Sequence, residues 1–153
     1  MWELMVLTVG RISDANIRLG VERYVSMLGG GWSLRLEAVA PSRRKEPSAC
    51  RGEEGKALLK RLPKDRISVA LHPGGERLSS ETLGSRLARW KDDGRRVAFV
   101  VGGPHGLSDE VLATCDHRLS LSDLTLPHEL AALVLVEQIY RAQARYSGKA
   151  YAK

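Results

Sequence analysis

The strongest constraint on this sequence is a repeated alternation between short apolar segments and longer amphipathic ones. The apolar segments are rich in β-branched residues and end at glycine, proline or polar residues, as buried strands do. We expect strands at 2–9, 32–39, 67–71, 97–101 and 118–121. Strands that alternate with helices of ten or more residues are typical of an α/β fold, with a mainly parallel sheet flanked by helices.

The intervening segments predict helices that begin near Asp14, Glu53, Ser80, Ser108 and Pro127. Their apolar residues recur at a spacing close to 3.6, which places them on one face of a helix. A charged loop bounded by prolines is expected at 41–47. The third strand is expected to end at 72–75, which reads His-Pro-Gly-Gly.

The last predicted helix is unusually apolar. Residues 130–136 read LAALVLV, so the helix is apolar around its whole circumference. Such a helix has to be covered on all sides. The interface of a homodimer would cover it, and so would a deep position in the core of a single chain.

The length of 153 residues predicts a single domain spanning 1–153. No apolar run is long enough to span a membrane, and the first residues lack the features of a secretory signal, so we expect a soluble, cytoplasmic protein. Two distant cysteines and four scattered histidines predict neither a disulfide framework nor a metal site.

Positive charge is in excess, with 24 Lys+Arg against 18 Asp+Glu and a net charge of +6. Such a balance favours contact with polyanions such as nucleic acid, although solubility alone also explains it. Basic residues gather at 43–66 and at the C-terminal end. Aromatic residues make up only 5% of the chain. Contact with nucleic acid would therefore depend on charge and shape rather than on stacked bases.

Two segments carry the chemical signal. The first, 100–108, reads VVGGPHGLS: a buried strand runs into three closely spaced glycines and then into a capped helix. Glycines there let a ligand lie against the backbone, although a tight strand-to-helix turn needs glycine as well. The second, 119–130, reads LSLSDLTLPHEL and is longer than helix capping requires. Its alternate leucines are suited to lining a pocket for a flat base.

These two segments, in this order, resemble the SPOUT superfamily of S-adenosylmethionine-dependent RNA methyltransferases. More narrowly, they are similar to the ribosomal large-subunit methyltransferase H family, whose members methylate N3 of a pseudouridine in 23S rRNA. The motifs are Val-Gly-Gly-Pro-x-Gly-Leu-Ser at 101–108, Leu-Ser-x-Leu-Thr-Leu-Pro-His at 121–128 and Val-x-Val-Glu-Gln-Ile-Tyr-Arg-Ala at 134–142. The resemblance extends, more thinly, over nearly the full length.

The resemblance implies a fold, an assembly and a ligand. The fold would include a deep C-terminal trefoil knot, and the protein would be a homodimer packed through the knot region. S-adenosylmethionine would be the methyl donor, with no metal, and the partner would be large-subunit rRNA or the assembled ribosome. By motif position, the cofactor would be held by Leu71, Gly103, Ser122, Asp123, Leu124, Thr125, Leu126 and Pro127.

In the family, a short tail that resembles Tyr-His-Lys reaches the site of the partner subunit. Here the tail ends in Tyr151, Ala152 and Lys153, so alanine stands where the family has histidine. Tyr151 and Arg141 are therefore the candidate catalytic residues. We interpret His105 as a permissive loop position, and nothing in the sequence places His128 at the methyl group.

Three functions stay open at this level. The first is an rRNA methyltransferase. The second, suggested by Ala152, is a related protein that binds the cofactor and ribosomal RNA but catalyses poorly. The third is an α/β nucleotide-binding module with no RNA partner, for which the net charge of +6 only supports solubility.

Overall fold

A computed structural model describes residues 1–151 of the chain. Its five strands form one sheet in the order β2-β1-β4-β3-β5, and every neighbouring pair is parallel. This arrangement confirms the expected α/β fold. The elements are β1 (Trp2–Val9), α1 (Ala15–Met27), β2 (Trp32–Val39), α2 (Pro47–Arg61), β3 (Arg66–Arg77), α3 (Ser80–Asp92), β4 (Arg96–Val101), α4 (Asp109–Thr114), β5 (His117–Ser120) and α5 (His128–Tyr146).

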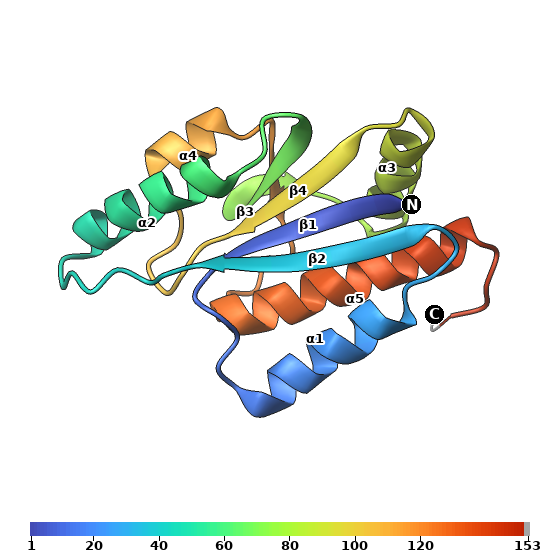
Figure 1. The fold of residues 1–153 in the computed structure, drawn as a ribbon, viewed down its shortest axis with the longest axis horizontal. Helices are drawn as coiled ribbons and strands as arrows, with labels where there is room; N and C mark the ends of the chain where they lie inside the picture. Colours follow the sequence, from blue (N-terminus) through green and yellow to red (C-terminus); the bar gives the residue numbers. More distant parts are fainter. Residues whose placement is uncertain (152–153) are drawn as a thin grey trace.

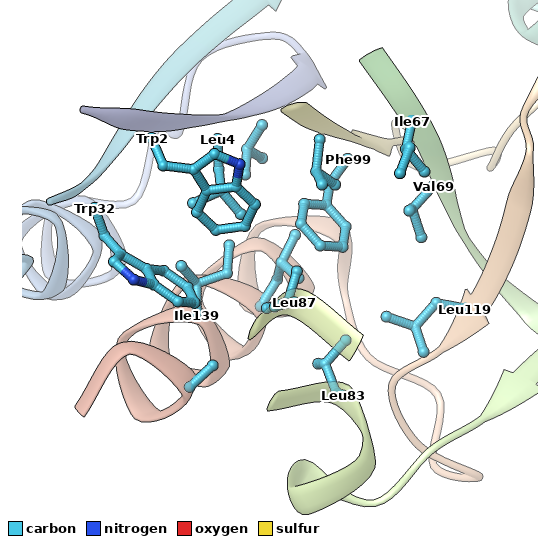
Figure 2. Packing of buried hydrophobic residues seen from close by; sticks show 14 of the residues in the cluster. Trp2, Leu4, Trp32, Ile67, Val69, Leu83, Leu87, Phe99, Leu119 and Ile139 are labelled. Carbon is cyan, nitrogen blue, oxygen red and sulfur yellow. The ribbon is translucent and has the colours of Figure 1, made fainter. Parts of the chain in front are cut away.

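Helices cover both faces of the sheet (Figure 1). On one face, side chains of α3 and α5 pack with Phe99 and Trp32 in a large apolar cluster, part of which is shown in Figure 2. On the other face, Leu58 of α2 and Val111 of α4 pack against alternate residues of β1 and β4. Because β4 is central, residues 97–101 are buried completely or nearly so, as their wholly apolar sequence predicts.

Helix α2 begins earlier than the sequence predicts, at Pro47 instead of near Glu53. Proline is suited to the first position of a helix, and the carboxylate of Glu46 accepts hydrogen bonds from the backbone N–H groups of Ser48 and Ala49. Glutamate is not a usual capping residue, so the sequence pattern did not reveal this start.

Strand β3 continues to Arg77, beyond the end that the sequence predicts at 72–75. The strand itself is unbroken, but its pairing with β5 shifts register between Leu71 and Glu76, a stretch that includes the Pro-Gly-Gly segment, and resumes at Glu76 and Arg77. A side chain on Gly75 would lie 2.7 Å from backbone atoms of Arg118 and Leu119. Glycine therefore lets the two strands stay close here, where a strand end was expected.

Helix α5 lies against the sheet with α1 and α3 beside it. Its residues Leu135, Val136 and Ile139 are buried, whereas Leu130, Leu133 and Val134 are only partly covered within one chain. The apolar circumference of this helix is thus incompletely covered by its own chain. The trefoil knot and the homodimer remain predictions.

Within residues 1–151, none of the helices combines the length and the apolar character that crossing a membrane requires.

Candidate functional site

A cavity of about 740 Å³ opens at the carboxyl ends of β4, β3 and β5. In parallel α/β sheets this edge is where ligands bind. Three stretches of chain form its walls: Leu71 to Pro73 after the first part of β3, Val101 to Gly106 after β4, and 119–128 after β5. Its volume lies within the range of about 300–1,000 Å³ that is usual for small-molecule sites.

The glycine-rich turn after β4 forms one wall. The backbone N–H of Gly106 donates to the carbonyl of Gly103 at 3.0 Å, which closes the turn. A side chain on Gly102 would come within 2.7 Å of the backbone carbonyl carbon of Gly106. The tight turn therefore needs glycine for close packing, and the same glycines leave bare backbone facing the cavity.

A buried carboxylate lies behind this turn. Glu54 of α2 is only 5% exposed, and its Oε2 accepts a hydrogen bond of 2.9 Å from the backbone N–H of Ser42. Its Oε1 has no hydrogen-bond partner among residues 1–151 and lies 3.3 Å from the position that a Cβ on Gly103 would take. Glu54 thus joins the loop after β2 to the glycine turn.

The segment 122–127 forms the opposite wall and is held mainly by local hydrogen bonds. The hydroxyl of Ser120 donates to the carbonyl of Ser122 at 3.1 Å, and the Ser122 hydroxyl accepts from the N–H of Leu124 at 2.9 Å. The guanidinium of Arg77 pairs with the carboxylate of Asp123 at 2.7 Å, and both side chains are largely exposed. Leu124 is 76% exposed, which leaves an apolar side chain at the edge of the cavity.

The start of α5 is fixed beside this segment by Glu129. Its carboxylate accepts hydrogen bonds from the backbone N–H groups of Ser13 and Asp14, each at 3.0 Å, and from the Ser13 hydroxyl at 2.8 Å. These hydrogen bonds, that from Asp14 first, lower the pKa of Glu129. The loop before α1 is therefore fastened to the helix that borders the cavity.

The predicted catalytic residues form a second cluster, in which Arg141 lies on the C-terminal half of α5 and Tyr151 comes from the segment after the helix. The guanidinium of Arg141 lies over the ring of Tyr151 at 5.0 Å and donates to Glu137 at 2.6 and 3.0 Å. The hydroxyl of Tyr151 donates to the same carboxylate at 3.4 Å, and its ring packs edge-on against Tyr140 at 4.8 Å.

The environment of this cluster fixes the charge of its members. Burial raises the pKa of Tyr151 well above its ordinary value, and a hydrogen bond with Tyr24 and the charge of Glu137 raise it further. Its hydroxyl therefore stays protonated and acts as a donor. The hydrogen bond to Glu137 raises the pKa of Arg141, which stays positively charged.

The residues expected to hold the cofactor and those expected to be catalytic are separated along α5. His128 borders the cavity, whereas Arg141 lies thirteen residues further along the helix. At 1.5 Å per residue, this places Arg141 about 20 Å along the axis. Tyr151 packs with Arg141 and not at the cavity of its own chain.

All eight residues expected to hold a cofactor line this one cavity at the carboxyl ends of the strands: Leu71, Gly103, Ser122, Asp123, Leu124, Thr125, Leu126 and Pro127. His128 borders the cavity as well, and His105 is exposed on the glycine turn. Ala152, where the family has histidine, lies outside the described residues.

Several residues of the two clusters were missed at the sequence level. Glu137 lies four residues before Arg141, a spacing at which opposite charges meet on a helix, so that signal was present. Tyr24 comes from α1 and had no sequence signal for its contact with Tyr151. Arg77 belongs to the part of β3 beyond the expected end of the strand, and Glu54 was simply one acid in a charged helix.

The chain is similar to known proteins over nearly its whole length. A family described as predicted SPOUT methyltransferase matches residues 2–151. Proteins named ribosomal RNA large subunit methyltransferase H are 40% identical in Anaeromyxobacter sp. (strain K) and 42% identical in Anaeromyxobacter dehalogenans (strain 2CP-C), each over 99% of both chains. The protein of that name in Stenotrophomonas maltophilia (strain R551-3) is 37% identical, over 95% of this chain and 96% of the relative.

Proposed function

The chain belongs to the SPOUT methyltransferase family, and on that premise we propose that it methylates N3 of a pseudouridine in 23S rRNA, with S-adenosylmethionine as the methyl donor. The observation that carries the proposal is the cavity at the carboxyl ends of β4, β3 and β5. Every residue that the family resemblance assigns to the cofactor lines it. The relatives' names support the large-subunit rRNA as the acceptor.

The residues of the cavity suit S-adenosylmethionine. Leu71 would lie against the adenosine, the bare backbone at Gly103 would hydrogen-bond the ligand, and 122–127 would wrap it. The cofactor supplies an electrophilic methyl group on a sulfonium. The protein's own task is then to hold the donor and acceptor in line and to keep water away from them.

The acceptor nitrogen must lose its proton before or during transfer, and Arg141 and Tyr151 suit the anion that forms. Arg141 remains a cation, because Glu137 raises its pKa. Tyr151 remains a hydrogen-bond donor, because burial raises the pKa of its hydroxyl. We assign both residues to orienting the acceptor base and stabilising its negative charge, and the proton itself would pass to solvent water before the methyl group is transferred.

A second copy of the chain would complete the site. Arg141 lies about 20 Å along α5 from the cavity of its own chain, so one chain does not bring the two groups together. Part of the apolar surface of α5 is also uncovered. A homodimer packed through α5 would cover that surface and bring the Tyr151 cluster of one chain to the cavity of the other.

The acceptor would be large-subunit ribosomal RNA, either free or in the assembled ribosome, and the protein would work in the cytoplasm with it. The proposal is tested by incubating the purified protein with labelled S-adenosylmethionine and, in parallel, with free 23S rRNA and with ribosomes from cells lacking this methylation. We expect label in a single 23S rRNA pseudouridine. Cofactor binding without transfer would contradict the catalytic assignment.

Ala152 favours one alternative, a protein that binds the cofactor and ribosomal RNA but catalyses weakly. Titration calorimetry with S-adenosylmethionine separates the two. Tight cofactor binding with slow methyl transfer by the unaltered chain, and faster transfer by an Ala152→His variant, would support the alternative. Rapid transfer by the unaltered chain would refute it.

A further inference from the structure

The structure divides the basic stretch 43–66 into two parts with different roles. Arg66 is buried and pairs with Glu3 at 2.7 Å, and Arg61 pairs with Glu37 at 2.7 Å. The positive charges of these two arginines are therefore neutralised by ion pairs within the chain. Arg43 and Lys45, in contrast, are exposed and form no ion pair with any residue in 1–151. Lys56, Lys60 and Lys64 are also exposed and form no ion pair with any residue in 1–151, but they lie along α2 and after it. The loop between β2 and α2 therefore holds the free positive charge of the stretch that lies at the carboxyl ends of the strands.

This loop lies at the same edge of the sheet as the cavity. All strands are parallel, so their carboxyl ends meet at one edge, which is the left end of the sheet in Figure 1. The loop follows β2 and the glycine turn follows β4, with only β1 between them. At a spacing of about 4.8 Å between strands, the two strand ends are about 10 Å apart.

Contacts within the chain hold the loop in this position. Ser42 donates its N–H to the buried Glu54 and accepts a hydrogen bond from the N–H of Arg44 at 3.1 Å. The thiol of Cys50 donates to the carbonyl of Arg44 at 2.7 Å. Arg51 of α2 reaches the carbonyl of His105 on the glycine turn at 3.5 Å. The loop thus presents its basic side chains from a backbone that is tied to the cavity wall.

We propose that the loop at 43–45 is an RNA-binding surface, in which Arg43 and Lys45 contact phosphates of the nucleotides that flank the target base. Arg44 adds to it, because its ion pair with Glu53 is exposed on both sides and such pairs contribute little. No aromatic residue lies in this loop. Recognition there consists of charge on the RNA backbone, which positions a substrate without reading its sequence.

This inference rests on the proposed function for its choice of partner. Exposed lysines and arginines near an active-site cavity neutralise phosphates, and each neutralised phosphate releases counterions, so binding weakens as salt rises. The base to be methylated would lie at the cavity, and the adjoining backbone would cross the loop. The loop would therefore act on RNA affinity and leave cofactor affinity unchanged.

The test compares two double variants that remove the same charge. Arg43→Ala/Lys45→Ala alters the loop. The control Lys60→Ala/Lys64→Ala removes two exposed lysines near the opposite end of the sheet, one in the last turn of α2 and one between α2 and β3. Affinity for purified ribosomes and for their large subunits is measured from 50 to 200 mM salt. Calorimetry with S-adenosylmethionine and thermal unfolding show whether each variant keeps its cavity and fold.

We expect the loop variant to lose at least tenfold in affinity at 50 mM salt. Two fewer phosphate contacts should lower the slope of log affinity against log salt by about 1.4–1.8. The unaltered protein should then weaken about tenfold more than the loop variant over this salt range. Cofactor affinity should be unchanged, and the control should bind subunits like the unaltered protein.

An equal loss in both variants would show that only net charge matters and would overturn the proposal. Unchanged binding of ribosomes and subunits in the loop variant would overturn it as well, and so would an unaltered protein that binds neither ribosomes nor large subunits. Binding that follows our expectation, together with an absence of methyl transfer, would refute the proposed function while leaving the RNA-binding surface in place.

Discussion

Replacing Gly102 with alanine is the most informative single perturbation of the cavity wall. The new Cβ would lie 2.7 Å from the carbonyl carbon of Gly106, 2.9 Å from its oxygen and 3.0 Å from the nitrogen of Leu107. All three are backbone atoms, so no side chain can rotate away. Ordinary contacts begin near 3.4 Å, and the turn would have to open by about 0.7 Å.

Such overpacking costs about 1–3 kcal/mol. With about 2 kcal/mol as the central value, a domain of this size should lose about 4–8 °C in Tm. Opening the turn also moves the cavity wall at Gly103. We therefore expect the affinity for S-adenosylmethionine to fall at least tenfold, which corresponds to about 1.4 kcal/mol.

Gly52→Ala is the matched control. Gly52 lies inside α2, with no atom within 4 Å of the position of its added Cβ. Alanine there should raise stability by about 0.5–1 kcal/mol, because glycine is a poor helix former. Thermal unfolding and titration calorimetry measure both variants. If Gly102→Ala unfolds and binds the cofactor like the unaltered protein, the close turn and its role in the cavity are refuted.

Three further predictions concern single side chains. Tyr151→Phe should slow methyl transfer about tenfold, which corresponds to about 1.4 kcal/mol of transition-state stabilisation, with little change in Tm. Because the pKa of Tyr151 is raised, the pH profiles of the variant and the unaltered enzyme should have the same shape near pH 10, and an inflection present only in the unaltered enzyme would show an ionising phenol. Glu3→Gln should cost about 2 kcal/mol in chemical denaturation, because it deprives the buried guanidinium of Arg66 of its carboxylate. The hydrogen bond from Arg66 lowers the pKa of Glu3 in the folded state. The contribution of Glu3 to the free energy of unfolding should therefore be complete above pH 4.5 and disappear as the pH falls through this lower pKa. A Glu3→Gln variant whose stability has the same pH dependence as that of the unaltered chain would contradict this. Glu129→Ala removes the acceptor of three hydrogen bonds from residues 13–14 and should lower the free energy of unfolding by about 1–3 kcal/mol. The amide hydrogens at 13–14 should exchange faster in the variant, and an unchanged exchange rate would contradict the role of Glu129 in holding this loop.

The sequence pattern predicts the layers of the fold well, because hydrophobic periodicity reports burial directly. The wholly apolar residues 97–101 correctly indicate a strand covered on both faces. The errors fall where one residue acts against its usual tendency. Glu46 caps α2 although glutamate is a poor capping residue, and Gly75 keeps β3 beside β5 where glycine normally ends a strand. The cap at Glu46 depends on the local backbone at Ser48 and Ala49. The close approach at Gly75 depends on Arg118 and Leu119, which are distant in sequence.

The site was predictable where a motif marks it and hidden elsewhere. The family resemblance identified eight of the residues that line the cavity. Glu54 could not be found in this way, because its importance comes from burial between the loop after β2 and the glycine turn. Tyr24 meets Tyr151 only because α1 and α5 lie side by side. Contacts of this kind are set by the packing of helices and leave no local pattern in the sequence.

The most direct test of the central proposal is mass spectrometry of 23S rRNA nucleosides from cells in which this protein has been deleted. We predict that one pseudouridine loses its N3 methyl group and that the unaltered protein, returned on a plasmid, restores it. Methylation of 23S rRNA pseudouridine that is identical with and without the protein would contradict the proposed function.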